Sequence, residues 1–347
     1  MIDRREDPPE AAAGAGLVLE RFRQPIEAAL RRTLDSREGA IYDMLRYHLG
    51  FDGSSPPQGK ALRPTLCLLI CDALGGRWQR ALPAAASIEL IHNFSLIHDD
   101  IQDGDRLRRG RPTLWTQWGV PQAINAGDAM FCLATLTLRD LRPEFDDELV
   151  VETMSVLQEA TRQMIEGQYL DVSYEQVLEI SLQQYLEMIR CKTGALLRSS
   201  IEIGALLADA GSPVRHRCRR FGEAIGRLFQ IRDDMLGIWG ESETTGKSVD
   251  SDIKRKKKSL PIVMALSVAG DREREALLGL YSQPTISDAD VVSVLDIFDR
   301  LRVKARVQQL ADEAHQEAMV LADAINFTDR GRTELLSLVN FLLERDH

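Results

Sequence analysis

The sequence predicts an all-α protein, a large single-domain helical bundle around a central cavity. Apolar residues recur every three to five positions, as in Leu17-Phe22-Ile26-Leu30, which is typical of helices with one buried face. Aromatic residues make up only 6% of the chain, and no set of alternating Val/Ile/Thr/Tyr/Phe runs joined by tight turns predicts a sheet. No linker marks a domain boundary, so we expect the inner helices of one domain to point side chains into a shared cavity.

The expected helices follow one another between clusters of Pro, Gly and Asp. Residues 1–15 are charged and rich in Pro and Gly, which predicts a flexible tail, followed by one domain over residues 16–347. The apolar-periodic segments cover 17–30, 41–49, 61–75, 80–102, 120–140, 146–170, 175–190, 192–210, 213–238, 258–269, 286–325 and 332–345.

Composition excludes several classes of protein. With 44% hydrophobic and 28% charged residues, the 347-residue chain can bury a large core. Its net charge of −10 argues against nucleic-acid binding. We expect no signal peptide and no integral membrane contact, because the start lacks an apolar core and no apolar run approaches the roughly 20 residues of a membrane span. Five cysteines without a C-x-x-C pair favour the cytoplasm.

Two aspartate clusters end apolar helical segments. Asp99, Asp100 and Asp103 occupy positions i, i+1 and i+4, and positions i and i+4 share one helix face. Carboxylates in this arrangement suit magnesium, which is held by one or two carboxylates together with substrate phosphates. Asp233 and Asp234 form the second cluster. Either pattern alone is weak, because so short a pattern also arises by chance.

A basic segment follows the first cluster directly, at Arg106-Leu107-Arg108-Arg109-Gly110-Arg111. It could be a solvated turn. However, metal-binding carboxylates followed by arginines are what a metal–diphosphate site requires, since cations bridge some phosphate oxygens and guanidinium groups bind the others.

At these residues the chain resembles the trans-isoprenyl diphosphate synthases, also called the polyprenyl synthetase family, and most of all geranylgeranyl diphosphate synthases. The resemblance runs in order along the chain, which leaves little room for coincidence, and it implies an all-α bundle that is usually homodimeric. It is carried by GKALRP (59–64), ELIHNFSLIHDDIQD (89–103), RRGRPT (108–113), NAGDAM (125–130), IEGQYLD (165–171), KTGAL (192–196), GRLFQIRDD (226–234), TGK (245–247) and SDIKRKKKSLP (251–261).

The resemblance implies roles for individual residues, with Asp99, Asp103, Lys192 and Asp233 as the catalytic set. It also implies three magnesium ions per active site, two held by Asp99 and Asp103 and one by Asp233. Asp100 and Asp234 would be outer or shared metal ligands, and Gln168 and Asp171 would support the metals. The residues that would bind the allylic diphosphate are Arg108, Lys192, Thr193, Gln230, Lys247 and Lys257. Those that would bind isopentenyl diphosphate are Lys60, Arg63, His92 and Arg109.

Plainer interpretations of some of these residues stay open. Lys60 and Arg63 could be surface charges at a helix start, and His92 could be a core histidine. Gln168 and Asp171 could be ordinary polar residues at a helix end.

The implied reaction is the magnesium-dependent condensation of isopentenyl diphosphate with an allylic diphosphate, in which the departing diphosphate takes the proton. Phe94, five residues before Asp99, lies about 7.5 Å deeper along the helix, and Ser95 beside it is small. In the family an aromatic residue here goes with a C20 product, so we expect geranylgeranyl diphosphate. Farnesyl diphosphate, the C15 product, is the near alternative if Phe94 already closes the cavity.

One position departs from the family pattern. The second cluster usually ends in a third aspartate, and here that position is Gly237. Glu241 or Glu243 could compensate for it. Two other functions stay open: a non-catalytic subunit of a heteromeric synthase, for which Gly237 is the one hint, and a class I terpene cyclase, which would not need the second diphosphate site.

Overall fold

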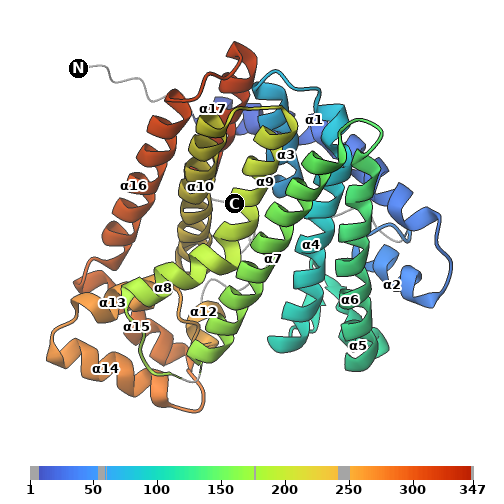
Figure 1. Cartoon of the computed structure of the whole chain (residues 1–347). Helices are drawn as coiled ribbons and strands as arrows, with labels where there is room; N and C mark the ends of the chain where they lie inside the picture. The colour runs from blue at the N-terminus through green and yellow to red at the C-terminus, as the bar shows by residue number, and fades with distance from the viewer. Residues whose placement is uncertain (1–7, 54–58, 60, 176, 241–250, 345–347) are drawn as a thin grey trace. The chain divides into compact units, whose positions relative to one another are not determined.

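The structure is a computed structural model that describes residues 8–53, 59, 61–175, 177–240 and 251–344. The described residues are almost entirely helical, with one short two-stranded hairpin (Figure 1), so the predicted all-α fold is confirmed. The chain divides into two compact units. Unit 1 comprises Met1–Thr161, Ser199–Arg219 and Ile325–Leu338, and unit 2 comprises Arg162–Arg198, Arg220–Ala324 and Val339–His347. One domain over 16–347 stays a prediction.

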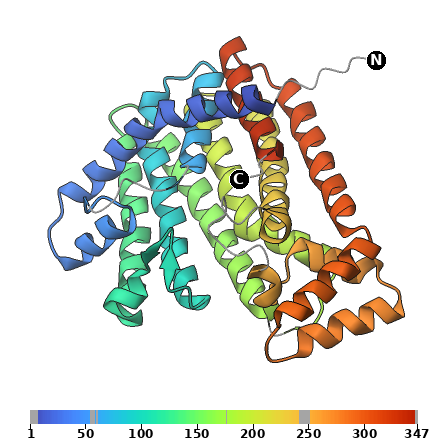
Figure 2. The same cartoon turned by 180° about the vertical axis from the view of Figure 1, so that it is seen from behind.

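Unit 1 is built around α4 (Leu82–Gln102). This helix buries residues on several faces, because its sequence is apolar almost all round. It packs on α3 (Leu62–Ala73) and α6 (Val120–Thr137). The first helix, α1 (Pro8–Asp35), passes across α3 and α4 in dark blue in Figure 2. The last turn of α4 and its C-cap, Asp103, carry the first aspartate cluster, so a buried helix positions these carboxylates.

The first helix overlaps the segment 1–15 that we expected as a tail, because α1 spans Pro8–Asp35, and residues 1–7 lie outside the described residues. Pro8 and Pro9 fit the first turn of a helix, because the backbone N–H groups of that turn have no partner within the helix and proline lacks this group. Alanines follow them, and Ala15 is fully buried. The Pro-rich start therefore begins a helix instead of preventing one.

The basic segment after α4 forms the hairpin of β1 (Leu107–Arg108) and β2 (Arg111–Pro112). Arg109 and Gly110 turn the chain with φ values of +53° and +76°. Two successive positive φ values are typical of the type I′ turn that joins tightly paired strands. The basic segment is therefore an ordered hairpin, largely exposed, with Arg108 paired opposite Arg111.

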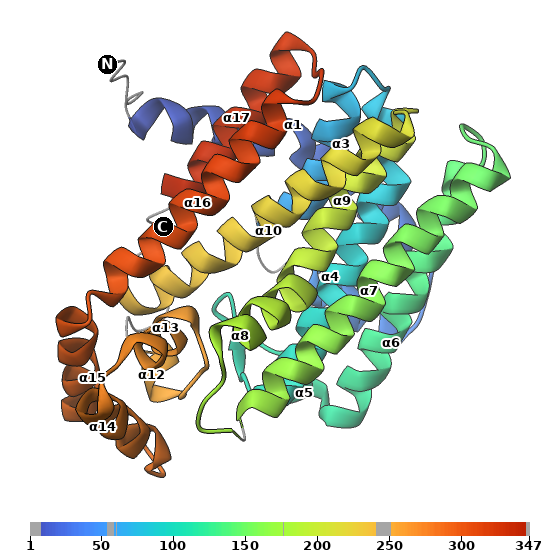
Figure 3. The same cartoon turned by 60° about the vertical axis from the view of Figure 1, so that its left-hand side comes forward.

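Unit 2 has its most apolar helix, α13 (Leu260–Val268), in its interior. There it packs on α8 (Leu182–Ile189), α15 (Asp288–Arg300) and α16 (Val303–Asp323). Figure 3 shows the long helix α10 (Ser212–Trp239) running beside α16 (Val303–Asp323). Arg227 of α10 pairs with Glu317 of α16 and joins the two helices.

Two helix predictions need correction. The segment expected as one helix over 286–325 is two, because Arg302 adopts a left-handed conformation with φ +52° between α15 and α16. A helix that the periodicity did not predict, α14, spans Asp271–Ser282. No helix among the described residues has both the length and the apolar character needed to cross a bilayer.

The remaining elements are α2 (Ala40–His48), η1 (Trp78–Ala81), α5 (Leu114–Trp118), η2 (Leu138–Leu141), α7 (Asp147–Glu175), α8 (Leu182–Ile189), the π-helical turn η3 (Arg190–Gly194), α9 (Ala195–Leu207), α12 (Ser251–Lys254), α15 (Asp288–Arg300) and α17 (Asp329–Glu344).

Candidate active site

The first aspartate cluster divides its carboxylates between two faces of α4. Asp99 and Asp103 are half-buried, whereas Asp100 is only 2% exposed. The Asp100 carboxylate accepts hydrogen bonds from Arg108 Nε at 2.8 Å and Nη2 at 2.7 Å. Because successive helical residues are rotated by about 100°, Asp99 and Asp103 share a face while Asp100 points to the hairpin. Asp100 therefore orients Arg108.

The hairpin is fixed to the end of α4 by backbone acceptors. Thr113 Oγ1 and Trp115 Nε1 both donate to the carbonyl of Asp105, at 2.9 and 2.8 Å. At the hairpin tip, the guanidinium of Arg109 lies against Gly59, where an added Cβ would come within 2.9 Å of it. Gly59 also has φ +133°. These contacts hold Arg109 beside the segment that contains the GKALRP motif.

Two of the residues assigned to isopentenyl diphosphate contact each other in unit 1. Arg63 Nη1 lies 3.4 Å from His92 Nε2. Burial and the neighbouring charges of Arg63 and Arg109 lower the pKa of His92 well below its ordinary value, so the imidazole is neutral beside the arginines. Lys60, the fourth residue of this set, lies outside the described residues.

The residues assigned to the allylic diphosphate in unit 2 begin at the π-helical turn η3. This turn packs tightly between glycines: a Cβ on Gly167 would lie 2.1 Å from the Lys192 nitrogen, and one on Gly226 would lie 2.7 Å from Gly194 Cα. The Lys192 ammonium pairs with Asp171. No side chain larger than hydrogen fits at these contacts, so the glycines determine where Lys192 lies.

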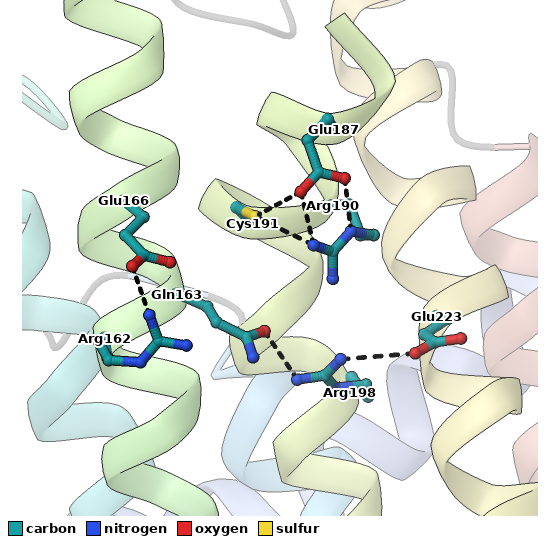
Figure 4. Close-up of polar contacts among 8 residues, drawn as sticks. All are labelled: Arg162, Gln163, Glu166, Glu187, Arg190, Cys191, Arg198 and Glu223. Carbon is teal, nitrogen blue, oxygen red and sulfur yellow. Dashed lines mark hydrogen bonds and ion pairs between the residues drawn. The ribbon is translucent and has the colours of Figure 1, made fainter. Parts of the chain in front are cut away.

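Polar contacts flank the same turn (Figure 4). Arg190 donates to Glu187 from Nε at 2.8 Å and from Nη2 at 2.6 Å. Arg198, at the start of α9, donates to Gln163 of α7 at 2.9 Å. The first contact joins the turn to α8, and the second joins α9, which follows the turn, to α7.

The second aspartate pair repeats the division seen in the first. Asp233 is exposed, whereas Asp234 is buried. Asp234 accepts hydrogen bonds from Tyr185 Oη at 2.6 Å, Gln230 Nε2 at 2.8 Å and the Leu260 amide at 2.6 Å. Burial raises the pKa of Asp234 to about 7 despite these donors. Asp234 is therefore committed to protein partners, and Asp233 is the carboxylate that faces solvent.

A chain of hydrogen bonds connects this network to the π-helical turn. Thr193 Oγ1 donates to Gln230 Oε1 at 2.6 Å, and the amide of Gln230 donates in turn to Asp234. Within unit 2 the structure thus brings Lys192, Thr193, Gln230 and Asp234 into one connected arrangement, in which Asp234 orients Gln230.

The space beside Gly237 holds a carboxylate that the sequence did not reveal. A Cβ on Gly237 would lie 2.4 Å from Asp252 Oδ2, so the carboxylate of Asp252 fills the space beside Gly237. Asp252 comes from α12 and is part of the SDIKRKKKSLP segment. Glu241 and Glu243, the compensating residues that we had expected, lie outside the described residues, as does Lys247.

The donor set fits magnesium shared with a substrate. Among the described residues, no three His, Cys, Asp or Glu side chains gather closely enough to hold a metal alone. Magnesium in such sites is held by one or two carboxylates together with phosphate oxygens, and Asp99 and Asp103 offer two such carboxylates on one helix face.

Two further residues of the predicted site are in the described part of unit 2. Lys257 is half-buried after α12, and Gln168 is half-buried on α7.

The residues expected to limit product length lie among aromatic neighbours in unit 1. Phe94 is 7% exposed, with its ring 5.2 Å from His98 and 5.4 Å from Phe131. Ser95 Oγ donates to the His92 carbonyl at 2.7 Å. Sequence reasoning missed Phe131, because its pairing with Phe94 depends on how α4 packs on α6.

Comparison with known proteins identifies relatives over most of the chain. The family model of the polyprenyl synthetases matches residues 44–298. A (2E,6E)-farnesyl diphosphate synthase of Mycobacterium tuberculosis is 36% identical over 328 residues, 92% of this chain and 90% of that protein. A geranylgeranyl diphosphate synthase of the same species is 35% identical over 336 residues, 95% and 93% of the two chains. The crystal structure of a polyprenyl synthetase from Streptomyces coelicolor superposes with a TM-score of 0.86 and 34% identity, covering 94% of this chain and 99% of that one.

The contact between Gly237 and Asp252 predicts a counterintuitive result. Gly237→Asp would restore the usual aspartate pattern, yet we expect it to lower both stability and turnover, because the Asp252 carboxylate must rotate away from the added Cβ and two carboxylates would then lie side by side. We expect the loss of stability to be about 1 kcal/mol, the lower end of the cost of overpacking. Thermal unfolding and steady-state turnover measure the two effects, and the double variant Gly237→Asp/Asp252→Gly should recover part of the loss. A single variant as stable and active as the wild type would contradict this contact.

Proposed function

Because the chain belongs to the polyprenyl synthetase family, we propose that it is a magnesium-dependent prenyltransferase that adds isopentenyl diphosphate to allylic diphosphates. Its product is a short-chain all-trans prenyl diphosphate. The observation that carries the proposal is the arrangement at the end of α4: Asp99 and Asp103 share a half-buried face, and Asp100 holds Arg108 of the basic hairpin. This arrangement presents oxygen ligands for metals and guanidinium donors for phosphate side by side.

Asp99 and Asp103 hold two of the three magnesium ions in this proposal, and Asp233 holds the third. When bound, magnesium neutralises the diphosphate and makes it a better leaving group. Lys192 and Thr193 bind the same diphosphate from the π-helical turn, which the surrounding glycines keep in place. The other ligands of the allylic diphosphate are Arg108, Gln230, Lys247 and Lys257.

Arg63, His92, Arg109 and Lys60 hold isopentenyl diphosphate so that its double bond can attack the allylic carbon, and proximity supplies much of the rate. His92 is neutral, and its contact with Arg63 orients that guanidinium. The departing diphosphate takes the proton, so no side chain serves as the general base. The packing of Asp252 beside Gly237 supports a catalytic role over that of a non-catalytic subunit.

For the product we propose geranylgeranyl diphosphate. Phe94 lies one and a half turns below Asp99, and its contacts with Phe131 and His98 hold its ring in place. Farnesyl diphosphate is the second candidate, favoured by the burial of Phe94 in this aromatic cluster and by the relative of that name. Assays with magnesium, isopentenyl diphosphate and each of the C5, C10 and C15 primers, read by chromatography, test both.

We further propose that the protein is a cytoplasmic homodimer that associates through α6. Val120, Ile124 and Leu136 are 40%, 42% and 43% exposed, and Cys132 is also exposed on α6. At about 100° per residue these side chains spread over roughly half of the helix circumference. Exposed apolar side chains gathered on one helix are typical of an interaction site.

The metal assignment predicts a large loss of turnover. Asp99→Ala and Asp103→Ala should each lower kcat on the order of a thousandfold, about 4 kcal/mol of transition-state stabilisation. Asp140→Asn, a change at an exposed residue of η2, is the control and should leave kcat unaltered. Near-wild-type turnover in either alanine variant would refute the assignment.

The product assignment predicts opposite effects at adjacent positions. Phe94→Ala should lengthen the products by opening space below Asp99, and Ser95→Phe should shorten them by filling it. Both are measured as product distributions by chromatography, with thermal unfolding as the check that each variant is folded. Unchanged distributions in the two variants would place the limit elsewhere.

The proposed dimer predicts that Ile124→Glu/Leu136→Glu halves the mass in solution, measured by size-exclusion chromatography with light scattering. Leu17→Glu is the matched control, because Leu17 is an exposed apolar residue on α1 and its change should not alter the mass. A wild-type monomer, or a dimer that survives the double change, would contradict an interface on α6.

A further inference from the structure

His48, the last residue of α2, is a histidine to which the proposed reaction assigns no role. It lines a small cavity together with Arg108, Arg109 and Arg111 of the hairpin and Asp100 of α4. His92, already assigned to isopentenyl diphosphate, lies near enough for the two imidazoles to influence each other. All these residues belong to unit 1. A histidine among phosphate-binding arginines is a candidate ligand for the same anion.

Asn93 determines which ring nitrogen of His48 carries the hydrogen. The side-chain amide of Asn93 donates to Glu89, to its carbonyl at 2.8 Å and to its Oε1 at 2.9 Å. With both N–H groups used, Asn93 can only accept from His48, with which it forms a hydrogen bond. One imidazole nitrogen therefore donates to Asn93, and the other is left for the cavity.

The arginines around His48 make its cavity attractive to an anion and keep the unliganded imidazole neutral. Burial and the charges of Arg108, Arg109 and Arg111 lower the pKa of His48 to about 3, so the imidazole is neutral without a ligand. Arg108 and Arg111 are paired with Asp100 and Asp52 respectively, each at 2.7 Å. A neutral imidazole offers a bare lone pair here, and a phosphate oxygen would bind to it only after it takes a proton.

We infer that His48 is a further ligand of the diphosphate group of isopentenyl diphosphate, with Asn93 and Glu89 as its positioning residues. This inference rests on the proposed function. His48 influences His92 and shares its cavity with Arg109, both assigned to isopentenyl diphosphate, and also with Arg108, assigned to the allylic diphosphate, so the kinetics decide between the two substrates. The alternative is a histidine that only joins α2 to Asn93 of α4.

Steady-state kinetics separate the two roles. A ligand role predicts that His48→Ala raises the KM for isopentenyl diphosphate about tenfold or more, while the KM for the allylic substrate and kcat at saturation change less than twofold. Asn93→Ala should raise the same KM by a smaller factor. His216→Ala, at an exposed histidine of α10, is the control. Equal changes in both KM values, or an unchanged KM for isopentenyl diphosphate, would overturn the inference.

If His48 only supported packing, it would not change the number of protons that the protein takes up on binding, so proton uptake distinguishes the two roles. Isopentenyl diphosphate alone, without magnesium or allylic substrate, is titrated into the wild type and into His48→Gln by calorimetry at pH 7.5 in buffers of different ionisation enthalpy. We expect the wild type to take up more protons than His48→Gln, because the bound anion offsets the field of Arg108, Arg109 and Arg111 and raises the pKa of the imidazole. The groups shared by both proteins, His92, Glu89, Asp52 and Asp100, cancel in the difference.

The outcomes distinguish this inference from the function on which it rests. A wild type that consumes no isopentenyl diphosphate with any primer refutes the proposed function. An active wild type whose proton uptake equals that of His48→Gln refutes the role of His48 alone.

Discussion

Neighbouring carboxylates on a helix cannot face the same way, and the candidate site depends on this constraint. In each aspartate pair one residue faces outward and the next is turned into the protein. Asp100 holds Arg108, and Asp234 accepts three hydrogen bonds that orient Tyr185, Gln230 and the start of α13. The buried member of each pair thus positions the surrounding donors, and the outward member presents its carboxylate on the more exposed side of the helix. Two adjacent aspartates therefore perform different tasks with the same functional group.

Glycine packing adds a second kind of control over the position of charged groups. A lysine has a long, flexible side chain, so its backbone must be fixed if its ammonium is to lie in one place. Gly167 and Gly226 allow the neighbouring helices to approach η3 closely, and Asp171 holds the end of Lys192. The position of Lys192 in unit 2 therefore depends on glycines, which have no functional group of their own, and replacing them would displace Lys192.

Much of the fold could be predicted because helical periodicity is a local property of the sequence. The apolar pattern located α3, α4, α6 and α10 to within a few residues, and the aspartate, arginine and lysine motifs named most candidate ligands. Contacts that form only through space were missed. Asp252 reaches Gly237 from another helix, Phe131 meets Phe94 across the packing of α4 on α6, and His48 is oriented by Asn93. The break at Arg302 was missed too, because an arginine in a left-handed conformation has no warning in the local pattern.

The π-helical turn at Arg190–Gly194 has a consequence for how such chains diverge. A π-turn accommodates one residue more than an α-helix does over the same rise, so α8 and α9 are out of phase with each other. Removing one residue from the turn would restore a continuous helix and rotate everything on one side of it by roughly a quarter of a turn. A change of that size leaves composition and hydrophobicity almost unaltered, yet it redirects a whole row of side chains. Single-residue insertions of this kind allow a helix to turn a different set of side chains toward a site without a new sequence motif.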